Sequence, residues 1–275
     1  MANCLFAINK KGYKKRTMKR KGFIKSVSVV AIMAFVIAVL AGCACSTSSQ
    51  KATYKVVNSG KLTVASSLDF PPLESSENGN PVGFDIAVIQ EVAKRLGLEC
   101  EIRDTKFDDI IPTIADGSQC DVGISALSIN SERGKLVDFS DSYYISDLAV
   151  VVAKGSYASE SELKGKSVVA MTDSTALDYA KKISEASTGC ETAAECFASV
   201  QAKKSQALVV DYPVAKTMIA SSYSGLEILE KVATGEKYGI AVNKDNTALK
   251  DAINEVLKEM EKDGTLKNLE DQYFK

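Results

Sequence analysis

"DVGISALSINSERGKLVDFSD", Asp121 to Asp141, is the stretch from which the rest of the chain is best interpreted. It begins with a short apolar run typical of a buried strand, "DVGIS". A polar turn follows and carries one arginine, Arg133, with Ser128 and Ser131 shortly before it. Because arginine binds carboxylates in a two-pronged geometry, we expect Arg133 to hold the carboxylate of a small ligand.

Strand-like and helix-like segments alternate on both sides of this stretch. Helical spacing is clearest in 84–97, where Val88, Ile89, Val92 and Leu96 share one face and Gly97 ends the helix. The alternation predicts an α/β protein with mostly parallel sheets flanked by helices. Strands are expected at 61–66, 98–103, 121–125, 166–171, 206–210 and 237–242. Helices are expected at 84–97, 107–117, 174–183, 197–204, 213–220 and 247–274, the last broken at Gly264.

Two long extended stretches, 146–154 and 235–242, flank the second set of strands and helices. They suggest that the chain crosses twice between two lobes. We expect 60–147 and 237–275 to form the first lobe and 148–236 the second.

The N-terminus has the order of a targeting segment: a basic region, an apolar run from Val27 to Leu40, and a small-residue cleavage site, "LAGC". The run is shorter than the roughly 20 residues that span a bilayer. "LAGC" resembles the lipobox of bacterial lipoproteins, which implies cleavage after residue 42 and a lipid on Cys43; an uncleaved anchor is the alternative. Met18 is a second candidate start. Residues 43–59, mostly small and polar, are expected to form a flexible tether.

Charge is unevenly distributed along the 275 residues. The overall net charge is −1, but residues 1–42 hold nine of the 34 basic residues and no acid, which leaves 25 basic against 35 acidic residues, about −10, in 43–275. An acidic body argues against nucleic acid as a partner. With no histidine and no paired-cysteine spacing, neither a metal site nor a cofactor is expected. An exported chain permits disulfides, and pairing of Cys190 with Cys196 stays open because it depends on geometry.

Polar residues follow several predicted strands, at the edge where open α/β sheets bind ligands. Ser67 and Phe70 follow the first predicted strand. Ala126, Ser128 and Arg133 follow the third. In the second half, Thr172, Ser174 and Thr175 open a helix, and Asp211 follows a buried strand. Arginine and helix N-termini suit a carboxylate, and aspartate suits an ammonium, so the set describes an α-amino acid site.

The motifs "GFDIAVIQEVAKRLGL", "SINSERGKLVDFSDSYY" and "ALVVDYP" closely resemble those of the polar amino-acid-binding proteins of ABC importers, from about Lys61 to Phe274. The resemblance implies the two-lobed type II periplasmic-binding-protein fold. It implies that Arg133 takes the ligand carboxylate, helped by Ser128 and the Ala126 backbone, and that Asp211 takes the ammonium. Phe70 and Phe107 would flank the ligand side chain, and residues 172–175 would close over it.

The sequence departs from the family pattern at three positions. The family often has aspartate where Ser67 stands, glycine or serine at Ala126, and glycine at Asp173. Structural roles are the alternatives to ligand binding at other positions. Asp211 and Ser174 could be helix caps, and Phe70 and Phe107 could be part of the core.

The sequence therefore predicts a lipid-anchored extracytoplasmic binding protein, not an enzyme, that delivers a polar amino acid to the permease and ATPase subunits of an ABC importer. The expected order of ligands is arginine or lysine, then glutamine, then other polar amino acids. The alternatives are a dehydratase-like enzyme on the same scaffold, with Asp69 and Asp173 as candidate acids or bases, and a receptor subunit.

Overall fold

The computed structural model describes residues 54–274. The predicted leader, Cys43, Met18 and residues 43–53 of the tether lie outside the described residues. Within 54–274 no helix is both long and apolar enough to cross a membrane.

The first sheet has the strand order β5-β1-β6-β13-β7. Its strands are β1 (Lys61–Ser66), β5 (Glu99–Asp104), β6 (Val122–Gly123), β7 (Asp138–Phe139) and β13 (Ala241–Val242). β1 pairs in parallel with β5 and β6, whereas β13 is antiparallel to β6 and β7. The helices of this part are α2 (Phe84–Leu96), α3 (Phe107–Asp116), α4 (Arg133–Leu136), α8 (Thr247–Lys262) and α9 (Thr265–Tyr273). We call this part the first lobe.

The second sheet has the order β10-β9-β11-β8-β12 and the same mixture of directions. Its strands are β8 (Tyr144–Ala153), β9 (Val168–Met171), β10 (Thr188–Cys190), β11 (Ala207–Asp211) and β12 (Leu226–Tyr238). β9 is parallel to β10 and β11, and β8 is antiparallel to β11 and β12. With the short 3-10 helix η1 (Glu160–Leu163) and helices α5 (Thr175–Ile183), α6 (Ala193–Gln201) and α7 (Tyr212–Ser221), it forms the second lobe.

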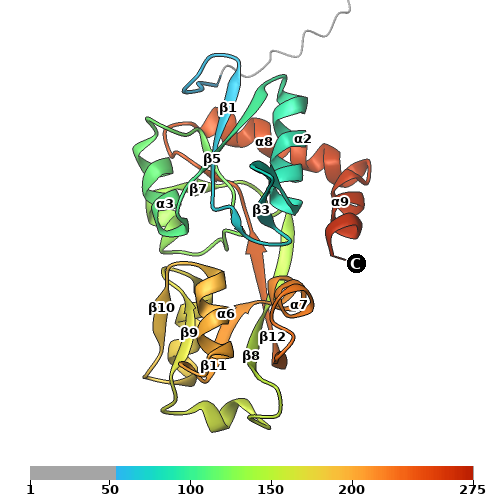
Figure 1. Ribbon diagram of the computed structural model, residues 1–275. Helices are drawn as coiled ribbons and strands as arrows, with labels where there is room; N and C mark the ends of the chain where they lie inside the picture. Colours follow the sequence, from blue (N-terminus) through green and yellow to red (C-terminus); the bar gives the residue numbers. More distant parts are fainter. Residues whose placement is uncertain (1–53, 275) are drawn as a thin grey trace, which may run out of the picture. The chain divides into compact units, whose positions relative to one another are not determined.

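The two-lobed α/β fold expected from the sequence is confirmed, with each sheet mixed in direction. The strands joined through helices are parallel, as predicted. The long strands β8 and β12 run antiparallel beside each other and connect the lobes (Figure 1). Near the first lobe, β12 ends at Tyr238, which pairs with Tyr144 and forms an isolated bridge with Ser128.

Several elements differ from the expected bounds. The strand expected at 121–125 is regular only over Val122–Gly123, and the helix expected from 197 starts at Ala193, where Thr192 caps it through its side chain. The small sheet of β2 (Asp69–Phe70), β3 (Glu74–Glu77) and β4 (Asn80–Val82) was not predicted. Its short polar strands lack the apolar alternation that signals a strand.

Helix α2 has the face predicted from its spacing, since Val88, Ile89, Val92 and Leu96 are all buried. Gly97 ends it in the left-handed conformation, with φ of 75°. At its start, Gly83 has φ of 132°, and a Cβ placed there would lie 2.2 Å from the Leu73 carbonyl oxygen. The chain can therefore enter α2 in this way only with glycine at 83.

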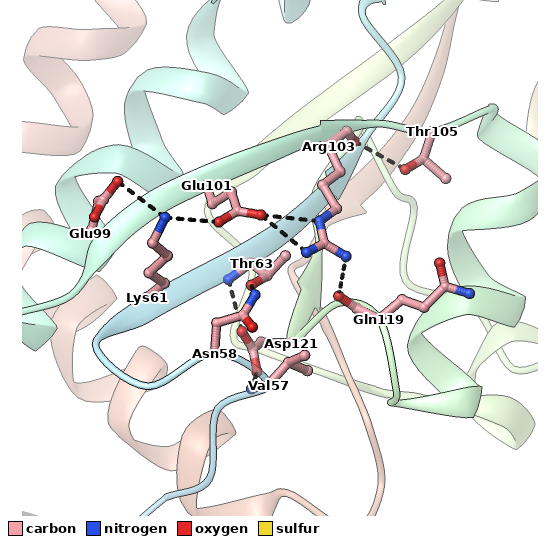
Figure 2. A network of polar contacts seen from close by, with 10 residues as sticks. All are labelled: Val57, Asn58, Lys61, Thr63, Glu99, Glu101, Arg103, Thr105, Gln119 and Asp121. Atoms are coloured by element: carbon pink, nitrogen blue, oxygen red, sulfur yellow. Dashed lines mark hydrogen bonds and ion pairs between the residues drawn. The ribbon is translucent and has the colours of Figure 1, made fainter.

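The described part of the expected tether, 54–59, is held against the first lobe. The Asp121 carboxylate accepts hydrogen bonds from the Val57 N–H at 2.6 Å and the Thr63 N–H at 2.8 Å (Figure 2). Tyr54 donates to the Leu96 carbonyl oxygen at 3.4 Å. The folded body thus extends upstream of residue 60.

Strand β5 lies at the edge of the first sheet and is covered with charge. Lys61 pairs with Glu101 at 3.1 Å and with Glu99 at 3.5 Å, and Arg103 pairs with Glu101 at 3.0 Å (Figure 2). Surface pairs of this kind add little stability. Charged side chains on an edge strand do oppose pairing with the edge of another sheet.

The pairing that the sequence left open is formed, because the structure contains a disulfide between Cys190 and Cys196. It links the end of β10 to helix α6, and the Cys196 side chain is buried in the core. Of the other described cysteines, Cys100 and Cys120 are free thiols.

We expect the substitution Gly83→Ala to lower the free energy of unfolding by about 2–3 kcal/mol, since the new Cβ meets backbone atoms and the φ angle disfavours an L-residue. Gly225→Ala is the control, because a Cβ at Gly225 meets nothing within 4 Å; its effect should stay within about 0.5 kcal/mol. Urea unfolding of both variants measures the difference, and equal stability would contradict the steric argument.

Candidate functional site

A cavity lies between the lobes at the ends of β1, β6, β9 and β11. All the predicted ligand-binding residues except Thr172 line it: Ser67, Phe70, Phe107, Ala126, Ser128 and Arg133 from the first lobe, and Ser174, Thr175 and Asp211 from the second. Thr172 is exposed, and its side chain donates to the Cys190 carbonyl oxygen at 3.1 Å. The topology therefore brings together polar residues from strand ends that are far apart in the sequence.

Arg133 reaches from the first lobe to the second. Its Nη1 donates to the Ser128 carbonyl oxygen and its Nη2 to the Asp173 carbonyl oxygen, both at 3.0 Å. Its guanidinium carbon lies 5.4 Å from the centre of the Phe107 ring, within cation–π range. Burial lowers the pKa of Arg133, while nearby carboxylates, Glu236 first, act against that shift. Among residues 54–274 no carboxylate lies within salt-bridge distance of Arg133, so this cation is suited to an incoming anion.

Asp211 directs a carboxylate into the same cavity from the second lobe. It is the N-cap residue of α7, but its side chain makes no capping bond and instead accepts a hydrogen bond from the Tyr238 hydroxyl. The Asp211 side chain therefore does not cap helix α7, so the structural role that competed with ligand binding is not the one it performs. Burial raises the pKa of Asp211 to about 7, while the Tyr238 hydrogen bond and the Arg133 charge act in the opposite direction.

Two site residues have left-handed backbones, Ala126 with φ of 47° and Asp173 with φ of 56°. Such conformations disfavour residues other than glycine and concentrate at functional sites. This explains why glycine suits the position of Asp173. The Ala126 N–H donates to the Asp85 carboxylate at 2.7 Å, so its carbonyl oxygen is the backbone group left for a ligand.

Ser174 and Thr175 open helix α5 but differ in how their side chains are engaged. The Ser174 Oγ accepts from the Leu177 N–H at 3.1 Å and donates to the Met171 carbonyl oxygen at 2.6 Å, as a helix cap does. The Thr175 Oγ1 donates to the Glu236 carboxylate at 2.8 Å. Ser174 therefore positions the helix terminus, whereas the Thr175 hydroxyl is held by a side chain of β12.

The cavity also contains acidic residues that sequence reasoning missed or gave little weight. Glu74 and Asp69 line it, and both are largely buried, Glu74 to 1% exposure. The Ser67 hydroxyl donates to Asp69 at 2.7 Å, and the Ser125 hydroxyl donates to Glu74 at 2.7 Å. Glu74 lies on the unpredicted strand β3, four residues after Phe70, where no apolar run marks a strand end.

The buried surroundings of these acidic side chains disfavour their ionised forms. Burial, and then the nearby Asp85, raise the pKa of Glu74 well above its usual range. Burial also raises the pKa of Asp85, to about 6, and that of Asp69. The Glu74 and Asp85 carboxyl groups also contact each other, and this contact raises the pKa of Glu74 and lowers that of Asp85, as expected when the Glu74 carboxyl donates to the Asp85 carboxylate. Across residues 54–274 no group of three or more His, Cys, Asp or Glu side chains is arranged to hold a metal ion.

The chain matches a family model described as bacterial extracellular solute-binding proteins, family 3, over residues 62–275. The chain belongs to this family. The L-cystine-binding protein TcyJ of Escherichia coli K12 is 28% identical, over 80% of this chain and 85% of its own. The arginine-binding extracellular protein ArtP of Bacillus subtilis 168 is 32% identical, and the match covers 78% of this chain and 86% of that protein.

Solved structures of this family have the same fold. An ancestral arginine-binding protein bound to arginine superimposes with a TM-score of 0.75 at 36% identity, and the match covers 78% of this chain and 99% of that one. The resemblance to amino-acid-binding proteins of ABC importers, and the two-lobed fold that it implies, are thereby confirmed.

The geometry around Asp211 generates a prediction that needs no ligand. Since the Tyr238 hydroxyl stabilises the ionised carboxylate, Tyr238→Phe should raise the pKa of Asp211 above about 7. Carboxyl-carbon NMR titration measures it, with Asp211→Asn used to assign the signal among those of Glu74 and Asp85. An unchanged or lowered pKa would contradict this role of Tyr238.

Proposed function

We propose that this solute-binding protein captures a polar, cationic amino acid between its two lobes and delivers it to an ABC importer. The observation that carries the proposal is the pair of opposite charges in one cavity, Arg133 from the first lobe and Asp211 from the second. An α-amino acid has a carboxylate and an ammonium on one carbon, so it can satisfy both residues at once.

Binding and closure are coupled by this arrangement. Buried charges are costly without a partner, and the ligand supplies a partner for each of them only when both lobes face it. We propose that 60–147 with 237–275, joined by the attached segment 54–59, move as one lobe and 148–236 as the other, and that the crossings β8 and β12 are the segments about which the lobes close.

The acidic residues favour a cation at the far end of the ligand side chain. Asp69 and Glu74 line the same cavity as Arg133 and contribute hydrogen-bond acceptors, and a cationic group would stabilise their ionised forms. Phe70 offers an aromatic surface to a guanidinium, whereas Phe107 already lies against Arg133. Asp69 and Glu74 can supply the negative charge missing at Ser67. The preferred order stays arginine or lysine, then glutamine.

The comparisons support an amino acid as the ligand and are compatible with a cationic one. Two of the relatives described above are arginine-binding by name and a third is cystine-binding. We further propose that residues 1–42 are removed, that Cys43 carries a lipid and that 43–53 tether the body to the outer face of the cytoplasmic membrane. The permease and ATPase subunits of the importer would be its partners. No cofactor or nucleic acid enters the proposal.

A dehydratase-like enzyme is the weaker alternative, as is a receptor subunit. Of the two candidate acids, Asp69 lines the cavity, whereas Asp173 contributes its backbone carbonyl oxygen to Arg133. Mass spectrometry of arogenate or prephenate incubated with the protein would detect such an enzyme through its product.

We expect a thermal-shift screen of residues 54–275 against the twenty amino acids, ornithine and cystine to show stabilisation by arginine or lysine. Ligand at a hundredfold excess over its dissociation constant adds about 2.7 kcal/mol to folding stability. Stabilisation by none of these compounds, in protein freed of bound ligand, would contradict the proposal.

Arg133→Ala should weaken binding of the preferred amino acid roughly 100-fold, because the ligand carboxylate would be left without its buried partner. Arg103→Ala is the control, since Arg103 belongs to the ion-pair network on the edge strand (Figure 2). Titration calorimetry compares the two variants, and undiminished affinity in Arg133→Ala would rule out the assigned role.

Glu74→Gln should weaken the binding of arginine about tenfold or more and leave glutamine less affected, because the buried Glu74 carboxyl can ionise when a cation lies against it, whereas an amide cannot. Glu77→Gln, an exposed residue on the same strand β3, is the matched control. Equal affinity of wild type and Glu74→Gln for arginine would contradict the acidic side-chain pocket.

A further inference from the structure

The Glu236 carboxylate contacts hydroxyl groups from both lobes. Its Oε2 accepts from the Ser128 Oγ at 2.5 Å and from the Thr175 Oγ1 at 2.8 Å, and the two hydroxyl oxygens are 3.5 Å apart. Ser128 belongs to the first lobe, Thr175 to the second, and Glu236 to the crossing strand β12. Both hydroxyl residues line the ligand cavity.

The crossing strand also supports the carboxylate of Asp211. Tyr238 follows Glu236 by two residues, so both side chains project from the same face of β12, and the Tyr238 hydroxyl donates to Asp211. The backbone there is fixed to the first lobe, since the Ile129 N–H donates to the Lys237 carbonyl oxygen at 2.8 Å. One short segment of β12 therefore holds three of the cavity's polar side chains, Ser128, Thr175 and Asp211.

The direction of these hydrogen bonds decides what the hydroxyls can offer a ligand. A hydroxyl group has one proton, and an ionised carboxylate can only accept. Ser128 and Thr175 each give their proton to Glu236, so their oxygens present only lone pairs to the cavity. A ligand group placed against them has to be a hydrogen-bond donor.

We infer that Glu236 is a positioning residue that makes this part of the cavity specific for the ligand's α-ammonium. The inference rests on the proposed function and adds to it. Ser128 and Thr175, kept as acceptors by Glu236, surround the ammonium together with Asp211, and the negative charge of Glu236 repels a carboxylate from the same place. The ligand is thereby bound in one orientation, with its carboxylate on Arg133.

A merely structural role for Glu236, as a clamp between the closed lobes, makes a different prediction. Loss of a clamp weakens every ligand by the same factor, because all of them bind the closed form. Loss of the acceptor arrangement weakens ammonium-bearing ligands selectively, because in Glu236→Gln the amide can donate and the hydroxyls can turn to donate to the ligand.

The test compares the strongest-binding amino acid with its α-hydroxy analogue, L-arginine and L-argininic acid in the first instance, by titration calorimetry. In wild type, L-arginine should bind far more tightly than the analogue. In Glu236→Gln that preference should fall at least tenfold. Glu230→Gln, an exposed residue further along β12, should keep the wild-type preference.

Two results would overturn the inference. One is an unchanged ratio of the two affinities in Glu236→Gln, whether or not both affinities fall together. The other is a ratio that changes equally in Glu230→Gln. Thermal unfolding of the free variants verifies that both fold. Wild-type protein that binds none of the amino acids would overturn the proposed function as well, so the two failures are distinguishable.

Discussion

The burial of opposite charges in one cavity is the constraint on which the arrangement of this protein depends. Asp211 is desolvated enough for its pKa to rise to about 7, and Arg133 is desolvated as well. Arg133 donates to the Ser128 and Asp173 carbonyl oxygens and Asp211 accepts from the Tyr238 hydroxyl, so the two charges line one cavity without a salt bridge between them. The proposed amino-acid ligand is a zwitterion and would pair with both charges at once without a net change in charge.

The connection between the lobes is also part of the site. Strand β12 places Glu236 beside Ser128 and Thr175, and Tyr238 beside Asp211. A movement of the crossing strand would therefore change the hydrogen bonds of the cavity directly.

The sequence predicted most of the fold and the charged frame of the site, for identifiable reasons. Arg133 and Asp211 follow strands with clear apolar runs, and the ends of such strands meet at one edge of a sheet. Glu74 and Glu236 were not predicted because they lie on segments without periodicity. Glu74 is on a short polar hairpin, and Glu236 is near the irregular end of a long strand. The strand β12 has register shifts before Glu236, so a simple alternation could not say which of its side chains face the cavity. The Cys190–Cys196 pairing likewise depends on the separation of two backbones, which no local pattern encodes.

The attachment of residues 54–59 to the first lobe has a mechanical consequence. Asp121 binds the Val57 N–H, and Asn246 binds the Lys55 carbonyl oxygen at 2.9 Å, so this segment moves with the first lobe. Under the proposed N-terminal anchoring, the first lobe would therefore be the half that is held. Within residues 54–274 the chain enters and leaves the second lobe through β8 and β12, so that lobe would be the half that moves in the proposed closure.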